Sequence, residues 1–253
     1  LVFRAAASKT MTRPDYSALA GFVSLDDLTH TGNGGNPQLK PIVSTNLDLA
    51  LEWYFAPRGL LSVGYYNMDL KDYVNFSNES RQYKDMQASE TSGQEVYSTY
   101  LVSVPSNKGA KVSGFEFNYI QPIGDNFGVS ANYTYADGHS SGGGPLAGAS
   151  KNTWNAAAYF ENANFNARVS YTYRSSFYAG VSRTDSFYQE GVGNLAASLG
   201  YSLNDHLSFT FDAMNLNNPK LSYTTTIDGL GRLPHATYIN GRQFYLTARY
   251  KFF

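Results

Sequence analysis

Histidine and acidic side chains are the groups in this sequence that could support acid–base or metal chemistry. The four histidines lie in segments with the composition of loops or turns: His30, His139, His206 and His235. No two of them have the HxxxH spacing of helical metal ligands. Asp205 and His206 fall in a predicted tight turn, where polar residues are the usual choice. The sequence therefore predicts no catalytic residue, no metal site and no cofactor.

Two further groups could bind small ions, and each has a simpler interpretation. Asp26 and Asp27 near His30 offer carboxylates to a cation in a loop, although solvated loop charge is the favoured interpretation. The glycine-rich run Gly142–Gly144 has the composition of a phosphate loop, but no helix and no Lys-Ser/Thr pair follows it. We therefore expect this run to form only a loop tip.

Aromatic side chains are the stronger candidates for ligand binding. A ring with a polar tip offers stacking area and a hydrogen bond to sugars or to the faces of aromatic chelates. Rings of this kind could instead belong to the aromatic belt of a membrane protein, or pack one loop on another. The candidates all fall in long segments between predicted strands: Tyr83, Tyr97, Tyr100, Phe177, Tyr178, Phe187, Tyr188, Tyr223 and Tyr238.

Ten segments with a two-residue hydrophobic period frame these candidates and predict an all-β fold. They cover residues 1–10, 42–55, 60–76, 108–120, 127–136, 151–160, 165–175, 191–203, 206–216 and 239–253. Short links rich in Pro, Gly, Asn and Asp alternate strictly with long ones. The short links are 56–59, 121–126, 161–164 and 204–205; the long ones are 11–41, 77–107, 137–150, 176–190 and 217–238. This alternation is typical of outer-membrane barrels, whose turns are short on the inner side and loops long outside.

The segment Val43–Phe55 shows the period most clearly. Apolar residues such as Leu47, Leu49 and Leu51 occupy the odd positions, and mostly polar residues the even ones. In a barrel the odd set faces lipid and the even set faces a hydrated lumen. Four charged residues are predicted on the lumen side, where they could pair with a domain inside the barrel: Arg168, Arg174, Asp212 and Arg249. In the segment 60–76 the period changes phase near Asn67, which predicts either a bulge or the point where the strand leaves the membrane.

Composition agrees with this class and excludes others. The chain has 253 residues, 21 Tyr, 16 Phe, no Cys, a net charge of −1 and a mean hydropathy of −0.36. Balanced charge argues against a basic nucleic-acid surface, so no nucleic-acid partner is expected. The sequence holds no run of 18 apolar residues, which excludes a spanning helix but not a barrel, since half of each barrel strand is polar.

Three stretches make the chain resemble TonB-dependent receptors of the Gram-negative outer membrane. Residues 35–41 (GNPQLKP) with 46–55 (NLDLALEWYF) resemble a signature of this family, and 61–74 resemble its next strand. Residues 241–252 are similar to its closing strand, with an extra Phe253 that leaves open which terminal Phe serves as the assembly signal. Within the family, residues 154–175 look most like a branch common in glycan-using bacteria.

The resemblance implies that residues 1–253 are the C-terminal part of a 22-stranded transmembrane, antiparallel, up-and-down barrel. The plug domain and the N-terminal strands would then lie outside this chain. It further implies an active transporter that binds a bulky, scarce solute at its outer loops and imports it with TonB-transduced energy. An oligosaccharide is the favoured solute and a siderophore or other metal chelate the next. The implied partners are outer-membrane lipid, the TonB complex acting through the plug, and a surface lipoprotein.

Three alternatives remain open at this stage. The ten strands could close into a barrel of their own. Such a barrel could be an outer-membrane protease, which requires paired Asp and His residues at the outer rim, and the sequence offers no convincing set. The chain could also belong to a passive pore or an adhesin without a plug.

Overall fold

The computed structural model describes residues 1–182, 185–227 and 229–252, so Phe253 lies outside the described residues. Ten strands form the main sheet: β1 (Val2–Thr12), β4 (Ile42–Ala56), β5 (Gly59–Lys84), β6 (Tyr97–Ile123), β7 (Phe127–Ser140), β8 (Asn152–Glu161), β9 (Phe165–Arg174), β12 (Val192–Ser202), β13 (Leu207–Met214) and β16 (Gln243–Tyr250). The long links hold the other elements: β2 (Val23–Asp26), β3 (Thr31–Gly34), α1 (Met86–Ser92), β10 (Phe177–Ser182), β11 (Asp185–Gln189), β14 (Lys220–Ile227) and β15 (Gly231–Ile239).

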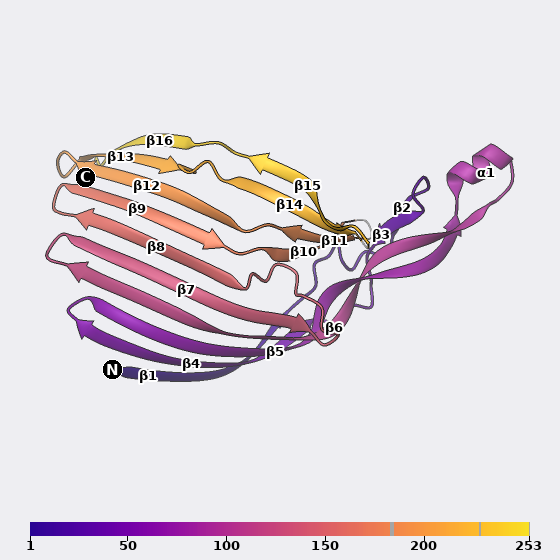
Figure 1. Cartoon of the computed structure of the whole chain (residues 1–253), viewed down its shortest axis with the longest axis horizontal. Helices are drawn as coiled ribbons and strands as arrows, with labels where there is room; N and C mark the ends of the chain where they lie inside the picture. The colour runs from indigo at the N-terminus through magenta and orange to yellow at the C-terminus, as the bar shows by residue number, and fades with distance from the viewer. Residues whose placement is uncertain (183–184, 228, 253) are drawn as a thin grey trace.

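The main sheet is an antiparallel meander in which each strand pairs with the next one in the predicted order. All ten predicted strands are confirmed. Tight turns and both termini gather at one end of the sheet, and the long links gather at the other (Figure 1). Left-handed residues make two of these turns, Arg58 at φ 62° and Gly124 at φ 63°. The alternation of short and long links is therefore a two-ended arrangement in space.

Two predicted boundaries need correction. Strands β5 and β6 are much longer than expected, because they stay paired up to Lys84 and Tyr97, far beyond the rest of the sheet (Figure 1). The predicted strand 239–253 is interrupted, since Ile239 ends β15 and β16 begins only at Gln243. Between them Gly241 has φ 72°, a conformation that leaves the strand region.

One face of the sheet, here called the outer face, carries the large apolar residues. Cross-strand partners share a face, and the register aligns Leu51, Val63, Phe117, Tyr133 and Trp154 in one row. Leu47 is 44% exposed and Leu51 45% exposed, so no second layer covers them. A row of exposed leucine and aromatic side chains on an uncovered sheet is the pattern of a surface that faces lipid.

The opposite face, here called the inner face, carries polar rows. One of these rows aligns Ser62, Asn118, Asn132, Asn155 and Thr172. Asn118 Nδ2 donates to Ser62 Oγ at 3.2 Å, and Asn155 Nδ2 donates to Asn132 Oδ1 at 2.8 Å. Neighbouring amides thus satisfy part of one another's hydrogen-bonding capacity, and the rest points to a hydrated interior.

The phase change near Asn67 is not a bulge. The register between β4 and β5 runs without interruption through Asn67 to Lys71, and the β5–β6 register shifts only between Leu70 and Tyr73. Asp72 lies in that shift with φ 56°. The other predicted explanation, that the strand leaves the membrane near Asn67, stays a prediction.

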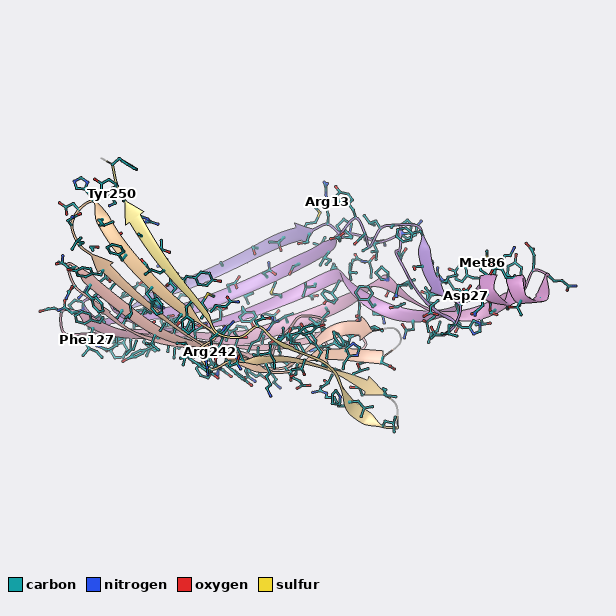
Figure 2. All side chains as sticks on the ribbon, turned by 90° about the horizontal axis from the view of Figure 1, so that it is seen from above. Arg13, Asp27, Met86, Phe127, Arg242 and Tyr250 are labelled. Carbon is teal, nitrogen blue, oxygen red and sulfur yellow. The ribbon has the colours of Figure 1, made fainter. Side chains whose placement is uncertain are left out.

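The sheet is an open shell. Among the described residues β1 pairs only with β4, and β16 only with β13. Figure 2 shows the shell curved, with β1 and the strand that ends near Tyr250 rising on the same side. This arrangement does not support a closed ten-stranded barrel. No helix in the described part of the chain is long and apolar enough to cross a membrane.

Candidate ligand-binding surface

The hairpin that β5 and β6 extend beyond the sheet, here called the outer hairpin, has its own small core. Tyr100 and Val102 have no exposed surface, and Val104 is 2% exposed. The β2–β3 hairpin supplies the cover, because β3 runs parallel to β6 and Leu25 packs on this core. Two long links that the sequence showed only as polar loops thus form one packed block, which consists of β2, β3, the ends of β5 and β6, and α1.

Asp85 joins the helix to this block. Its carboxylate caps α1 by accepting from Ala88 N at 2.8 Å, and its second oxygen bonds Ser98 Oγ and His30 Nε2, each at 2.9 Å. The Asp85 side chain is 4% exposed. The backbone N–H of Ala88, followed by His30, holds the pKa of this carboxyl below its ordinary range.

Asp27 fastens the same block from the other side. Its carboxylate accepts from Tyr100 Oη at 2.7 Å and from the backbone N–H groups of Met86 and Gln87 at 3.0 and 3.2 Å. Figure 2 shows Asp27 beside the start of the helix, near Met86. Burial of the Tyr100 ring, together with the bond to Asp27, raises the pKa of its phenol above the ordinary value.

The expectation of solvated loop charge fits the exposed Asp26 and His30, whereas Asp27 is half-buried and held by internal bonds. Asp26 accepts from the backbone N–H groups of Leu28 and Thr29, while Asp27 and His30 make the bonds above. A cation would have to displace these internal donors. Among the described residues no group of three His, Asp or Glu side chains is arranged to hold a metal ion.

The three aromatic candidates of the outer hairpin have different surroundings. Tyr100 is buried, and Tyr83 packs edge-to-face against it with 6.0 Å between ring centroids. Both therefore serve the core of the outer hairpin. Tyr97, which is 61% exposed, remains free to meet a solute.

The other six aromatic candidates lie together on a separate four-stranded sheet, β10–β11–β14–β15, here called the loop sheet. The ring of Phe187 stacks on that of Tyr223 with 5.1 Å between the ring centroids and an interplanar angle of 3°. Tyr238 meets Tyr223 edge-on with 5.8 Å between the centroids. His235 adds an edge-on contact to Phe187 at 5.0 Å. Phe187 and Tyr223 are half-buried and Tyr238 is 56% exposed, so this aromatic cluster has an accessible edge.

The other side of the loop sheet combines rings with charge. Tyr178 and Tyr188 are cross-strand partners with centroids 5.6 Å apart, and the Arg232 guanidinium lies 4.3 Å from the Tyr188 ring. Glu190 Oε1 accepts from Arg232 at 3.2 Å and from Thr224 Oγ1 at 2.6 Å. Burial raises the pKa of Tyr178, so its hydroxyl stays a hydrogen-bond donor.

Arg174 connects the main sheet with this region. Its guanidinium lies 3.9 Å from the Phe177 ring, and it donates to Ser150 Oγ at 2.5 Å and to the Gly148 carbonyl. Arg174 was predicted to pair with a domain inside the barrel, and its contacts here hold the link between β7 and β8 against β10.

The remaining lumen candidates lie on the inner face, lower in the sheet. Arg168 and Asp212 flank Ser198 in the register and border a depression of about 310 Å³. Ser198 Oγ donates to Asp212 at 2.6 Å. Arg249 is exposed and lies opposite Ser208 on the edge strand β16. Their contact with a domain inside the barrel stays a prediction.

Sequence reasoning missed several polar members of the loop sheet, and it placed two histidines wrongly. His139 and His235 were expected in loops, yet they lie in β7 and β15. Arg232, Glu190 and His235 were not among the candidates. A sequence signal for the loop sheet was present in residues 220–239, where apolar and polar residues alternate in two short segments joined by a turn, the pattern of a hairpin.

The sequence itself matches a known family over most of its length. A family model described as TonB dependent receptor-like, beta-barrel covers residues 1–216. The chain belongs to the TonB-dependent receptor β-barrel family. Members of this family are transport receptors of the Gram-negative outer membrane that interact with TonB and bind small-molecule ligands. No curated protein matches the sequence.

Solved receptors share the fold. The ferric enterobactin receptor PfeA of Pseudomonas aeruginosa, determined with enterobactin, superimposes with a TM-score of 0.69 at 15% identity over 98% of this chain and 38% of its own. The siderophore receptor PirA of Acinetobacter baumannii superimposes with a TM-score of 0.66 at 15% identity, over 98% of this chain and 38% of PirA. The copper transporter OprC superimposes with a TM-score of 0.65 at 15% identity, over 98% of this chain and 36% of OprC. The chain thus spans little more than a third of these receptors, and the expected oligosaccharide specificity finds no support among them.

A pH prediction follows for the outer hairpin of this TonB-dependent barrel. Because the pKa of Asp85 is lower in the folded hairpin than its ordinary value of 3.8, its bonds contribute stability above that pH. This contribution is lost as the pH falls through the folded pKa. We expect amide exchange in residues 85–98, corrected for intrinsic rates, to show excess opening below about pH 3.8. In Asp85→Asn this excess opening at low pH should vanish. An identical pH profile in the variant would show that the Asp85 carboxylate is not the group that controls the stability of the outer hairpin.

Proposed function

We propose that this chain forms the C-terminal part of the barrel of an active transporter in the outer membrane of a Gram-negative bacterium. In this proposal a plug domain and the remaining strands, outside the chain, complete the receptor. The unpaired edges of β1 and β16 support it, since an open sheet edge in lipid leaves backbone groups unsatisfied at several kcal/mol each. TonB-transduced energy, acting through the plug, would drive import.

The proposed solute is a bulky metal chelate that carries flat groups and negative charge. The aromatic cluster on the loop sheet carries this proposal, because the stacked pair Phe187 and Tyr223 and the exposed Tyr238 form a preformed platform. Arg174, held over the Phe177 ring, and Arg232, held over the Tyr188 ring on the other side of the loop sheet, add positive charge to the region. The likeness to siderophore receptors agrees with this class, although at 15% identity it supports the fold alone. An oligosaccharide, or a solute captured with a surface lipoprotein, would use the rings without the charge.

Uptake measurements on the whole receptor test the proposal. Deletion of the gene is expected to abolish import of one class of ferric chelate, while oligosaccharide import stays unchanged. Combined Phe187→Ala and Tyr223→Ala should weaken binding of that chelate about tenfold, the loss expected for one aromatic anchor. Tyr16→Ala is the matched control, since Tyr16 is an 87% exposed tyrosine in the long link 11–41, away from the loop sheet. Unchanged uptake of every chelate in the deletion strain would refute the proposal.

A further inference from the structure

Polarity on the outer face changes abruptly at one level of three neighbouring strands. Tyr65, Phe115 and Tyr135 are direct partners across β5, β6 and β7 and end the apolar zone. The next outer-face row is Asn67, Ser113 and Asp137, and the one beyond it is Asp69, Lys111 and His139. Lys151 reaches back toward this boundary, with Nζ 5.5 Å from the centre of the Tyr135 ring.

The height of the apolar zone fits a membrane. On β7 it runs from Phe127 to Tyr135, which are eight residue steps apart, or about 27 Å along the strand. At a tilt of about 40° this distance covers about 20 Å of depth, close to the ~25 Å apolar band of outer-membrane barrels. The charged row beyond Tyr135 therefore lies at the level of lipid headgroups.

A cleft of about 500 Å³ opens at this level. Asp69, Lys111 and His139 line it together with the turn at Ser141 and Gly143. The turn is held in place, because Ser141 N donates to the Gly109 carbonyl at 2.7 Å. Within the described part of the chain none of the three titratable side chains forms an ion pair. Lys111 and His139 thus keep free donors for an anion, and Asp69 keeps a free carboxylate.

An apolar groove of about 270 Å³ lies lower on the same strands. Its floor is small, because the cross-strand partners Ala131 and Ala156 leave room between the larger rings. The walls come from Leu61, Phe117, Tyr119, Tyr133 and Trp154. The groove continues the lipid-facing surface of β6, β7 and β8, so its occupant must be apolar.

We propose that the outer face of β5–β8 binds one phosphorylated lipid of the outer leaflet, with its headgroup phosphate in the cleft and an acyl chain in the groove. The proposal relies on the membrane location proposed above. Lys111 and His139 donate to the phosphate, and Asp69 shares a divalent cation with it. Carboxylate and phosphate oxygens together are the usual ligands of Mg²⁺. Both signs of charge in the cleft favour a phosphate accompanied by such a cation over an isolated anion.

A lipid fits better than a soluble phosphate because two separate observations point to it. The cleft lies just beyond the aromatic row that ends the apolar zone, and the groove lies inside that zone on the same strands. A soluble anion would use the cleft alone, and a detergent or unphosphorylated lipid would use the groove alone. Only an amphiphile with a phosphate occupies both.

Native mass spectrometry of the whole receptor in mild detergent with Mg²⁺ tests this inference. The probes are lipid A with two phosphates, the same lipid after removal of its phosphates, and inorganic phosphate. We expect one tightly retained lipid A and at least fivefold weaker retention of the dephosphorylated form. Inorganic phosphate should not displace the lipid. Equal retention of both lipids, or displacement by inorganic phosphate, would overturn the proposal.

Three variants locate the site. Combined Lys111→Gln and His139→Gln should weaken lipid A at least tenfold, and Ala156→Phe should weaken both lipids by filling the groove. Lys108→Gln is the matched control, since it removes a lysine from the same strand but from the inner face. Unaltered binding in the first two variants would refute the site.

Solute uptake by the same variants separates this inference from the proposed function. Lipid binding lost with uptake retained supports the lipid site on its own. If the wild type retains lipid A and its dephosphorylated form equally but still takes up the chelate, the lipid site is overturned and the transport proposal stands. Selective lipid binding by a receptor that imports no chelate supports the lipid site while the transport proposal fails.

Discussion

Replacing Tyr100 by alanine is expected to open the outer hairpin while the membrane-facing sheet stays folded. Tyr100 is fully buried, packs against Tyr83 and His30, and donates to Asp27. Truncation of a buried aromatic ring leaves a cavity and removes its dispersion contacts, and here it also removes the bond to Asp27. The local opening equilibrium should rise by a factor of about a thousand. Amide exchange of residues 97–104 measures it.

The same strand supplies the control. Tyr97→Ala removes a ring of equal size that is 61% exposed, so amide exchange should change less than about threefold. Tyr100→Phe keeps the ring and loses only the hydroxyl, and it should fall between these two variants. Equal exchange in Tyr100→Ala and Tyr97→Ala would show that the outer hairpin has no core of its own.

The second large effect concerns the lipid-facing side of the sheet. Val169 is 52% exposed on the outer face of β9, midway between Phe165 and Tyr173. Val169→Arg would place a guanidinium near the middle of the bilayer, at a cost of about 2–4 kcal/mol in the free energy of unfolding. Denaturant titration of the receptor refolded in lipid vesicles measures this loss.

Thr172→Arg is the matched control because Thr172 is an exposed residue of the same strand on the inner face. There the arginine stays hydrated, and the stability should change by less than about 1 kcal/mol. Equal losses in the two variants would mean that the two faces of β9 meet similar surroundings, which contradicts a lipid-facing assignment.

The ten strands of the main sheet were predictable because a sheet with one apolar and one polar face imposes a two-residue period on its sequence. Segments such as 165–175 show that period almost without exception, and β9 was found at Phe165–Arg174. The extension of β5 to Lys84 was not predictable, since both of its faces there meet polar or mixed surroundings and the period is lost. Its strand character depends on pairing with β6.

The candidate sites were less predictable because their contacts join distant segments. His30 and Asp85 are 55 positions apart, and Asp27 and Tyr100 are 73 apart. No local pattern indicates that such residues meet. The aromatic content of the outer links was visible, but its division into a buried hairpin core around Tyr100 and an accessible loop sheet required the fold.

A cysteine scan of β7 would show whether alternate residues of these strands contact lipid. The chain contains no cysteine, so each substitution between Phe127 and His139 gives this chain one fluorophore position. In vesicles of brominated lipid we expect strong quenching of the fluorophore at positions 129, 131, 133 and 135, little at 130, 132 and 134, and a sharp decline from 137 onward. Uniform quenching, or quenching of the even positions, would contradict it.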